Sequence, residues 1–232
     1  MIHGPKVPEV DERMIKLLIG LIAIMLPSLV WWLSRPEVLG SISASYWEGP
    51  WPQTIFIGFL FAIAGFLLAY DGRTTPERVA SKIAAVAALL IALFPCGCTR
   101  HEEIIQGVHY AAAVVMYCVL AFFCWKFRKR ALLKRWVQAR VRVWVYTGCG
   151  LALVLAIAML AFNYLANDAL SSGRPDFVFV WEAVGLGAFG LSWLTASHFL
   201  PFLNARAERF NPLALTYKPP VEPASTGEMD GG

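Results

Sequence analysis

Long apolar runs alternate with short polar segments along most of the chain. Six runs are long enough, or nearly so, to cross about 30 Å of hydrocarbon, which takes roughly 20 helical residues. They lie at 15–33, 53–70, 79–95, 107–125, 141–165 and 177–200. None shows the strict alternation of a barrel strand, and helices and closed barrels are the structures that satisfy the backbone in lipid. The pattern predicts an all-α, polytopic bundle of six transmembrane helices.

Positive charges are concentrated on one side of this predicted bundle. The densest cluster is the segment 126–142, KFRKRALLKRWVQARVR. Cytoplasmic segments of membrane proteins carry an excess of Lys and Arg. With this segment and both chain ends inside, only Arg35, Arg100 and Arg174 of the 20 basic residues fall outside. We therefore expect an N-in, C-in protein of a bacterial-type cytoplasmic (inner) membrane.

The basic segment 126–142 is also a candidate partner for membrane lipids. Each Lys or Arg near an anionic surface contributes on the order of 1 kcal/mol of attraction. Anionic head groups are therefore the partners expected there. Nucleic acid is not expected, because the charge follows the topology and no nucleic-acid-binding motif accompanies it.

The composition supports the same class and divides the chain into three parts. Hydrophobic residues make up 58% and charged residues only 16%, whereas a soluble domain has about a quarter charged residues. We expect a cytoplasmic segment at 1–14, a six-helix transmembrane domain at 15–203 and a cytoplasmic tail at 204–232. The tail includes KPPVEPASTGEMDGG, and beyond about residue 212 it is predicted to be disordered because it cannot bury a core.

The five cysteines do not form the paired spacing of a disulfide framework. Cys118, Cys124 and Cys149 lie in apolar runs and are interpreted as packing residues. Cys96 and Cys98, in Cys-Gly-Cys, could ligate a metal or pair with each other. We expect ordinary cysteines at a helix end, because no second Cys or His pair completes a zinc pattern.

Candidate chemistry begins in the first outer segment, GSISASYWEGPWPQ. Ser41, Ser43 and Ser45 alternate there and are followed by Glu48. Alternation predicts an extended strip with its hydroxyls on one side, able to bind a head group or the tops of neighbouring helices. The alternative is a polar connection beneath a belt of aromatic residues.

The fourth and sixth predicted helices each add a polar group on the same outer side. Glu102, Gln106 and His109 have the spacing of one helical face, with Glu102 also a candidate capping residue for Thr99. Glu182 lies at a similar depth in the sixth helix, and an intramembrane carboxylate is costly unless paired or hydrated. We predict that His109 and Glu182 are partners.

These residues together predict an outward-facing polar pocket. Its members are Ser41, Ser43, Ser45, Glu48, Glu102, His109 and Glu182. The first hypothesis is a non-enzymatic protein that binds or senses a lipid or small polar ligand there. The second is a lipid-directed hydrolase or transferase in which His109 and Glu182 are the catalytic or metal-ligating candidates. A small transporter is the third, and the sequence itself requires no cofactor.

Several of these segments resemble a known group of proteins. GSISASYW, QTIFIGFLFAIAGFLLAYDGR, ALFP, GVHY and WEAVGLGAFGLSW are similar to segments of uncharacterised bacterial six-span integral membrane proteins. The layout is more distantly similar to the DRAM, Frag and Sfk type of membrane proteins. That second resemblance implies a role connected with lipid remodelling and membrane organisation.

Overall fold

A computed structural model describes residues 11–35, 38–98, 101–204 and 208–212 of the 232-residue chain. Within these ranges the regular structure is entirely helical, which confirms the all-α prediction. The elements are α1 (Glu12–Leu33), η1 (Ser43–Tyr46), α2 (Pro50–Ala69), α3 (Thr75–Leu93), α4 (Val108–Leu132), α5 (Val137–Leu165), α6 (Ala169–Gly173), α7 (Phe177–Ala196) and η2 (Pro201–Leu203).

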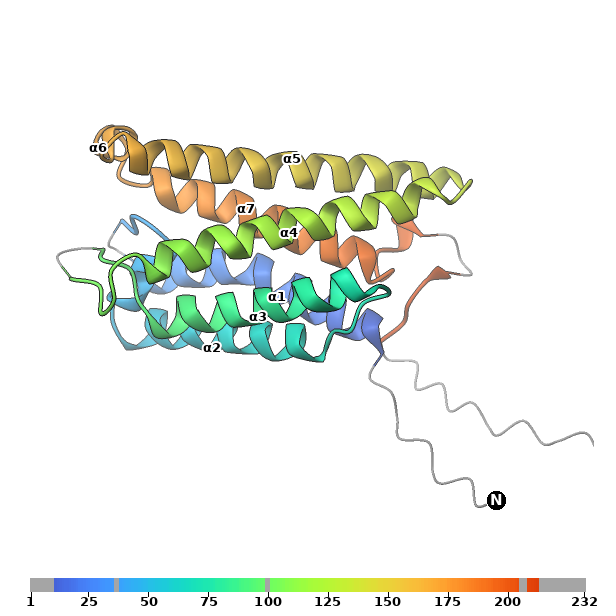
Figure 1. The fold of residues 1–232 in the computed structure, drawn as a ribbon, viewed down its shortest axis with the longest axis horizontal. Coiled ribbons are helices and arrows are strands. Elements are labelled where there is room, and N and C mark those ends of the chain that lie inside the picture. Colours follow the sequence, from blue (N-terminus) through green and yellow to red (C-terminus); the bar gives the residue numbers. More distant parts are fainter. Residues whose placement is uncertain (1–10, 36–37, 99–100, 205–207, 213–232) are drawn as a thin grey trace, which may run out of the picture.

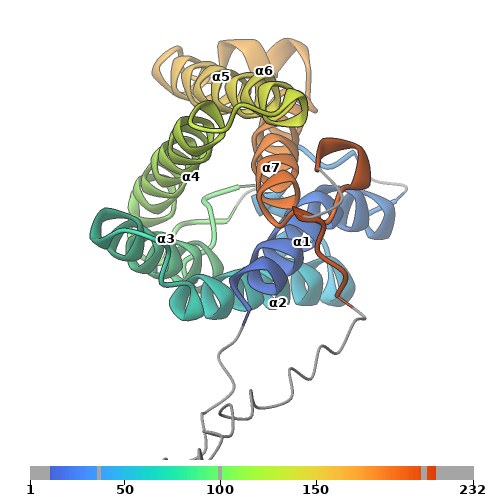
Figure 2. The same cartoon turned by 90° about the vertical axis from the view of Figure 1, so that its right-hand side faces the viewer.

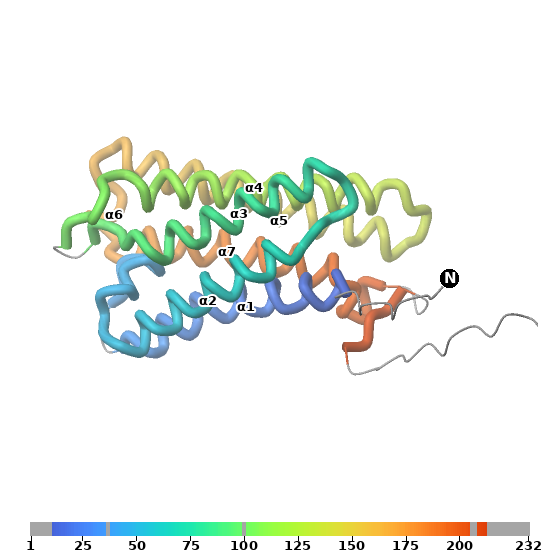
Figure 3. The backbone as a smooth tube through the Cα atoms, turned by 60° about the horizontal axis from the view of Figure 1, so that its bottom comes forward, coloured from blue at the N-terminus to red at the C-terminus, as the bar shows by residue number. Residues whose placement is uncertain are grey.

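The six long helices form a closed ring when viewed along the bundle (Figure 2). Each packs on its two neighbours in the order α1, α2, α3, α4, α5, α7, and α7 returns to α1. Consecutive helices run in opposite directions (Figure 1). We call the end that carries the α2–α3 and α4–α5 connections the basic end. The other end, with η1, α6 and the α3–α4 connection, is the opposite end (Figure 3).

Five of these helices, α1, α2, α4, α5 and α7, are long and apolar enough to cross a membrane. They correspond to five of the six apolar runs, as expected for a multi-pass membrane protein. α3 is of similar length and lies in the same ring, but its first two turns carry Glu77, Arg78 and Lys82. α3 thus has the length and the neighbours of a transmembrane helix, but it is less apolar than the other five long helices.

Aromatic rings fill the middle of the ring of helices. Trp193 of α7 is fully buried and packs edge-on against Tyr70, Phe123 and Phe189 at centroid distances of 5.2–5.4 Å. Because offset and edge-to-face arrangements are the favoured geometries of such pairs, this cluster fixes how α7 is rotated relative to α4.

Glycines allow a close helix contact where α1 packs against α7. A Cβ added to Gly190 would lie 2.6 Å from Ile24 Cγ1 and 2.7 Å from the Gly20 carbonyl oxygen. A Cβ added to Gly20 would in turn lie 2.9 Å from the Gly190 carbonyl oxygen. The absence of side chains at both positions lets the two backbones touch, as small residues commonly do between membrane helices.

The basic segment 126–142 is mostly helical, not a loop. α4 continues to Leu132 and α5 starts at Val137, so the connection itself is only residues 133–136. The α4–α5 hairpin extends beyond the other helices at the basic end (Figures 1 and 3). Its basic side chains therefore project from rigid helix ends.

The predicted terminal segments are partly changed by the structure. α1 begins at Glu12, so residues 12–14 of the expected cytoplasmic segment are helical, while residues 1–10 lie outside the described residues. Residues 208–212 follow the bundle at the basic end, where the Phe210 N–H donates to the His198 carbonyl at 3.0 Å. The predicted disorder beyond 212 falls outside the described residues.

Candidate functional site

The three serines do not form an extended strip, because η1 coils the backbone from Ser43 to Tyr46. Ser41 Oγ accepts the Ala44 N–H at 2.9 Å, and the Ser45 hydroxyl donates to the Ile42 carbonyl at 2.6 Å. Two of the three hydroxyls are therefore used locally, as serines commonly are in turns. Only Ser43 reaches the helices.

Ser43 joins His109 to Glu182. His109 Nε2 lies 3.0 Å from Ser43 Oγ, and the Ser43 hydroxyl lies 3.3 Å from Glu182 Oε1. The predicted partners His109 and Glu182 are linked indirectly, through Ser43. The two groups share one hydroxyl, with the Ile42 N–H donating to the second carboxylate oxygen at 2.5 Å.

The hydrogen-bond partners restrict where protons can be in this chain. His109 Nδ1 lies 2.8 Å from the Phe94 carbonyl oxygen, which only accepts, so Nδ1 carries a proton. If His109 is neutral, Ser43 donates to Nε2 and Glu182 must be protonated to donate to Ser43. If His109 is charged, Nε2 donates to Ser43 and Ser43 donates to a Glu182 carboxylate. The chain can thus pass one proton between α4 and α7 through a serine.

Other predicted pocket members lie apart from this chain. Glu102 is exposed and, with Gln106, precedes α4, which begins only at Val108. The expected helical face is therefore wrong, and the predicted capping pair of Glu102 with Thr99 involves a residue outside the described ranges. Glu103 Oε2 accepts the Gly107 N–H at 2.5 Å just before α4. Glu48 follows η1 and is half-buried. Its side chain makes no hydrogen bond to Ser43, His109 or Glu182, all of which are described residues.

His109 is poorly placed to ligate a metal. Both of its ring nitrogens already have protein partners, Phe94 and Ser43. Among the described residues, no group of three or more His, Cys, Asp and Glu side chains converges as a metal site requires. The geometry gives the metal-dependent hypothesis for His109 and Glu182 no support.

The expectation of ordinary cysteines at 96 and 98 is also wrong. The structure joins Cys96 and Cys98 in a disulfide. Both lie in the α3–α4 connection at the opposite end, beyond the last turn of α3. The search for regularly spaced cysteine pairs did not predict this disulfide, because its two cysteines are only two positions apart.

Two adjoining cavities lie at the basic end, away from the predicted pocket. The smaller, of about 50 Å³, has room for a few water molecules or a group of similar size. The charged side chains that line it are all basic: Lys16, Arg73, Arg130, Lys134 and Arg142. The larger, of about 430 Å³, shares Lys16, Arg73 and His198 with the first and adds Asp11, Glu12 and Arg13.

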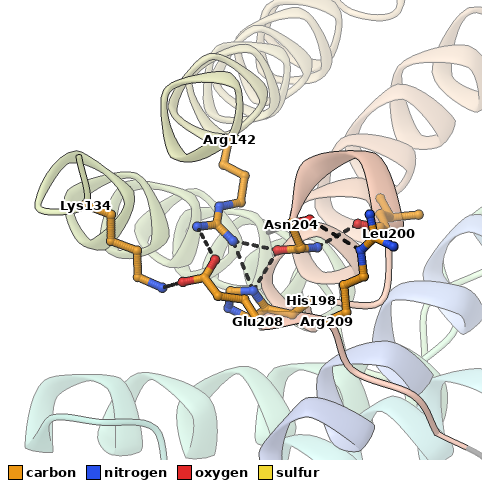
Figure 4. Close-up of polar contacts among 7 residues, drawn as sticks. All are labelled: Lys134, Arg142, His198, Leu200, Asn204, Glu208 and Arg209. Atoms are coloured by element: carbon orange, nitrogen blue, oxygen red, sulfur yellow. Dashed lines mark hydrogen bonds and ion pairs between the residues drawn. The ribbon is translucent and has the colours of Figure 1, made fainter. Parts of the chain in front are cut away.

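Arg142 organises the wall of the smaller cavity (Figure 4). It is only 2% exposed, and its guanidinium donates to Asn204 Oδ1 at 2.5 Å and to Glu208 Oε2 at 3.1 Å. The other Glu208 oxygen lies 2.5 Å from Lys134 Nζ. A carboxylate from the C-terminal segment therefore lies between two cations of the cavity wall.

His198 completes this cluster in an unusual backbone conformation. It has φ 62°, a left-handed conformation that Gly or Asn usually takes after a helix end. Its Nδ1 lies 2.7 Å from Asn204 Oδ1 and 3.0 Å from Arg142 Nη1. Burial, together with the charges of Arg142 and Lys134, lowers the pKa of His198 to about 4, against the Asn204 hydrogen bond.

A second buried carboxylate supports the neighbouring cations. Glu77 is fully buried and pairs with Arg130 and, at 3.5 Å, with Lys126. The Thr74 hydroxyl and the Arg73 N–H also donate to it, at 3.0 and 3.2 Å. Because four donors surround it, Glu77 holds Arg130 at the cavity, while the Arg73 side chain makes no ion pair with the described residues.

Sequence reasoning missed most of this end. The sequence analysis assigns no site role to the residues that form this cluster: Lys16, Glu77, Arg142, His198, Asn204 and Glu208. One signal was available. Lys16 follows Glu12 by four residues at the start of an apolar run, the spacing of a helical ion pair, and the two lie 2.9 Å apart.

No family model matches the chain, and no curated protein or solved structure matches it either. The resemblance to bacterial six-span proteins and to the DRAM, Frag and Sfk type stays a prediction. The functional argument therefore rests on the geometry of this chain alone.

Proposed function

We propose that this multi-pass membrane protein binds an anionic, phosphate-bearing lipid head group in the basic cavity. The observation that carries the proposal is the smaller cavity, whose five charged lining residues are all cations. Arg73 is the lining cation that makes no ion pair with the described residues, and phosphate oxygens suit Arg and Lys donors. Three of these cations, Arg130, Lys134 and Arg142, belong to the segment 126–142, where anionic head groups are expected from the sequence. The ligand-binding pocket expected from the sequence lies at the other end of the bundle.

The orientation belongs to the same proposal. We infer six spans, with α3 as the sixth, and a basic end that faces the cytoplasm of a bacterial-type inner membrane. All described basic residues except Arg35 and Arg174 lie towards the basic end, as the positive-inside rule requires. Anionic lipids of the cytoplasmic leaflet would then meet the cavity.

Cysteine labelling in whole cells tests this orientation. Leu133 at the basic end and Ile104 at the opposite end are 85% and 69% exposed. With the native cysteines removed, a membrane-impermeant maleimide should label Ile104→Cys and leave Leu133→Cys unlabelled until the cells are permeabilised. The reverse result would place the cavity outside and remove the cytoplasmic part of the proposal.

A pair of arginines tests the binding site itself. Arg73 lines both cavities and is free of ion pairs with the described residues, whereas Arg78 is exposed beside Asp71 at 3.6 Å and lines neither cavity. Arg73→Gln should weaken binding of phosphatidylglycerol by about fivefold, the equivalent of roughly 1 kcal/mol. Arg78→Gln should change it little.

Binding is measured by native mass spectrometry from mixed micelles, with phosphatidylcholine as the neutral reference. Soluble inorganic phosphate and glycerol phosphate form a second arm, and competition by either would identify the free phosphate group as sufficient. If Arg73→Gln and Arg78→Gln weakened phosphatidylglycerol binding equally, the lipid would be attracted by the surface charge in general, and the proposed site would be wrong.

A second candidate function, a serine hydrolase at the opposite end, is favoured by one observation. Ser43 Oγ, His109 Nε2 and the Phe94 carbonyl on Nδ1 have the order of a nucleophile, a base and an orienting acceptor. A fluorophosphonate probe should label the native protein and fail to label Ser43→Ala and His109→Ala, while Ser172→Ala is labelled normally. An unlabelled native protein would reject this candidate.

A further inference from the structure

The Cys96–Cys98 disulfide has one sulfur that can be reached from solvent. Cys96 is 1% exposed, whereas Cys98 is partly exposed. The three other described cysteines, Cys118, Cys124 and Cys149, are free thiols on helices α4 and α5. A thiol that approaches from outside the protein therefore meets Cys98 first.

Side chains from three segments fix the backbone around the disulfide. The Trp47 indole N–H donates to the Cys96 carbonyl at 3.1 Å, and His109 holds the Phe94 carbonyl two residues earlier. Trp47 also stacks on His101, with centroids 3.9 Å apart and ring planes nearly parallel. These contacts hold the Cys-Gly-Cys turn independently of the disulfide bond itself.

A hydroxyl and a carboxylate lie beside the turn. Ser41 Oγ is 3.9 Å from Cys98 Sγ, and since a disulfide sulfur has no hydrogen, the hydroxyl is the donor. A Cβ added to Gly97 would lie 3.1 Å from Glu103 Cγ, so Glu103 packs against the turn. Its Oε1 is buried without a hydrogen-bond partner among the described residues. Buried acceptors without partners are rare and need an explanation.

We propose that Cys96 and Cys98 are a thiol–disulfide exchange site for a dithiol substrate, such as two neighbouring cysteines of a polypeptide. The first substrate thiolate attacks Cys98 Sγ, the Cys96–Cys98 bond breaks, and Cys96 leaves as a thiolate that takes up a proton. The second substrate thiolate attacks the mixed disulfide and releases Cys98. The substrate gains a disulfide, and its two electrons and two protons are transferred to Cys96 and Cys98.

The surrounding groups fit the two halves of this exchange. The Ser41 hydroxyl can stabilise the Cys98 thiolate when it is released, because hydrogen bonding favours the charged form of an acid. The unpartnered Glu103 oxygen lies on a side chain packed against the turn and is a candidate acceptor for the S–H of a newly formed thiol. The lipid-binding proposal does not use this oxygen.

The first experiment uses the full chain in detergent, with Cys118, Cys124 and Cys149 replaced by Ala. A reduced peptide with two cysteines is added in excess, and free protein thiols are counted by alkylation and mass spectrometry. Each protein molecule should gain two thiols while one peptide disulfide forms, with the circular dichroism of the folded helices unchanged. A disulfide that resists the peptide until the protein unfolds would show a purely structural bridge and overturn the proposal.

The second experiment separates the roles of the two cysteines with glutathione disulfide as the probe. Cys96→Ser leaves Cys98, which should form a stable mixed disulfide at least about tenfold faster than Cys96 does in Cys98→Ser, because reactivity follows access. Adding Ser41→Ala to Cys96→Ser should slow the reaction several-fold. Equal rates for the two single-cysteine proteins would contradict the assigned order of attack.

Discussion

At the scale of single residues, the buried polar side chains at the two ends of the protein have different partners. At the opposite end Ser43, His109 and Glu182 satisfy one another, so that chain stabilises the junction of η1, α4 and α7. At the basic end Lys16 and Arg142 are buried at 5% and 2% exposure beside a cavity. Buried charges are costly unless paired, and Lys16 is paired with Glu12 and Arg142 with Glu208. The neighbouring Arg73 makes no ion pair with the described residues and is the cation left for a ligand.

Ser43→Ala tests the hydrogen-bonded chain. The substitution leaves His109 Nε2 and Glu182 Oε1 without their shared partner, and an unsatisfied buried polar group costs about 1–3 kcal/mol. Ser45→Ala, which removes one local hydrogen bond to Ile42, should cost about 0.5–1.5 kcal/mol. Denaturant unfolding in micelles compares the two variants, and a larger loss for Ser45→Ala would contradict the linking role of Ser43.

Acid should destabilise the basic end. The pKa of His198 is about 4 in the folded protein, below its ordinary 6.5, so the unfolded chain binds the proton first and stability falls from about pH 6.5 to pH 4. Burial by itself would raise the pKa of Glu208, but the Lys134 and Arg142 partners outweigh it and lower the pKa, so the contribution of Glu208 is lost as the pH falls below 4.5.

The matched variant is His198→Asn, because Asn tolerates the left-handed backbone and does not titrate. Thermal unfolding recorded from pH 7 to pH 4 should show a smaller loss for the variant than for the native protein. Parallel curves over this range would show that His198 does not contribute to the pH dependence.

At the scale of elements, the positions of the helices were predictable and their rotations were not. Runs of apolar residues predicted the long helices to within a few residues, because length and hydropathy determine them, except that α4 continues beyond its apolar run into the basic segment and ends at Leu132. Which face of α4 meets η1 depends on packing, so the sequence placed Ser43, His109 and Glu182 in one pocket but did not predict that Ser43 links the other two. The alternating serines were misread because Ser41 and Ser45 hydrogen-bond to their own turn.

Gly190 should be essential to the α1–α7 contact, whereas Gly187 should not. A Cβ at 190 meets Ile24 and the Gly20 backbone, but a Cβ at 187 meets nothing within 4 Å. Gly190→Ala should cost about 1–3 kcal/mol or more, and Gly187→Ala should be neutral or slightly stabilising. Comparable unfolding midpoints for both variants would show that the helices are not packed as described.

The C-terminal segment should compete with the ligand. Glu208 pairs with Lys134 and Arg142 in the cavity wall, so it occupies cations that an anion would use. Glu208→Gln should lower stability at neutral pH and strengthen phosphatidylglycerol binding several-fold. Asp176→Asn, which removes only an exposed pair with Arg174 at 3.8 Å, is the control. Unchanged or weaker lipid binding by Glu208→Gln would contradict this competition.

At the scale of the whole molecule, one ring of helices carries two kinds of chemistry at its two ends. The basic end has a cation-lined cavity, and the opposite end has a serine–histidine–glutamate chain and a disulfide. Charge distribution along the sequence predicted that the ends differ, since it follows topology. It did not predict a cavity, because a cavity depends on how Arg130, Lys134 and Arg142 are held by Glu77 and Glu208.

The most direct test of the central claim is an experimental structure of the protein in nanodiscs that contain phosphatidylglycerol. The account predicts a phosphate group in the smaller cavity, within hydrogen-bonding distance of Arg73 and at least one of Lys16 and Arg130. Anionic lipid confined to the outer surface of the helices, with water alone in the cavity, would contradict it.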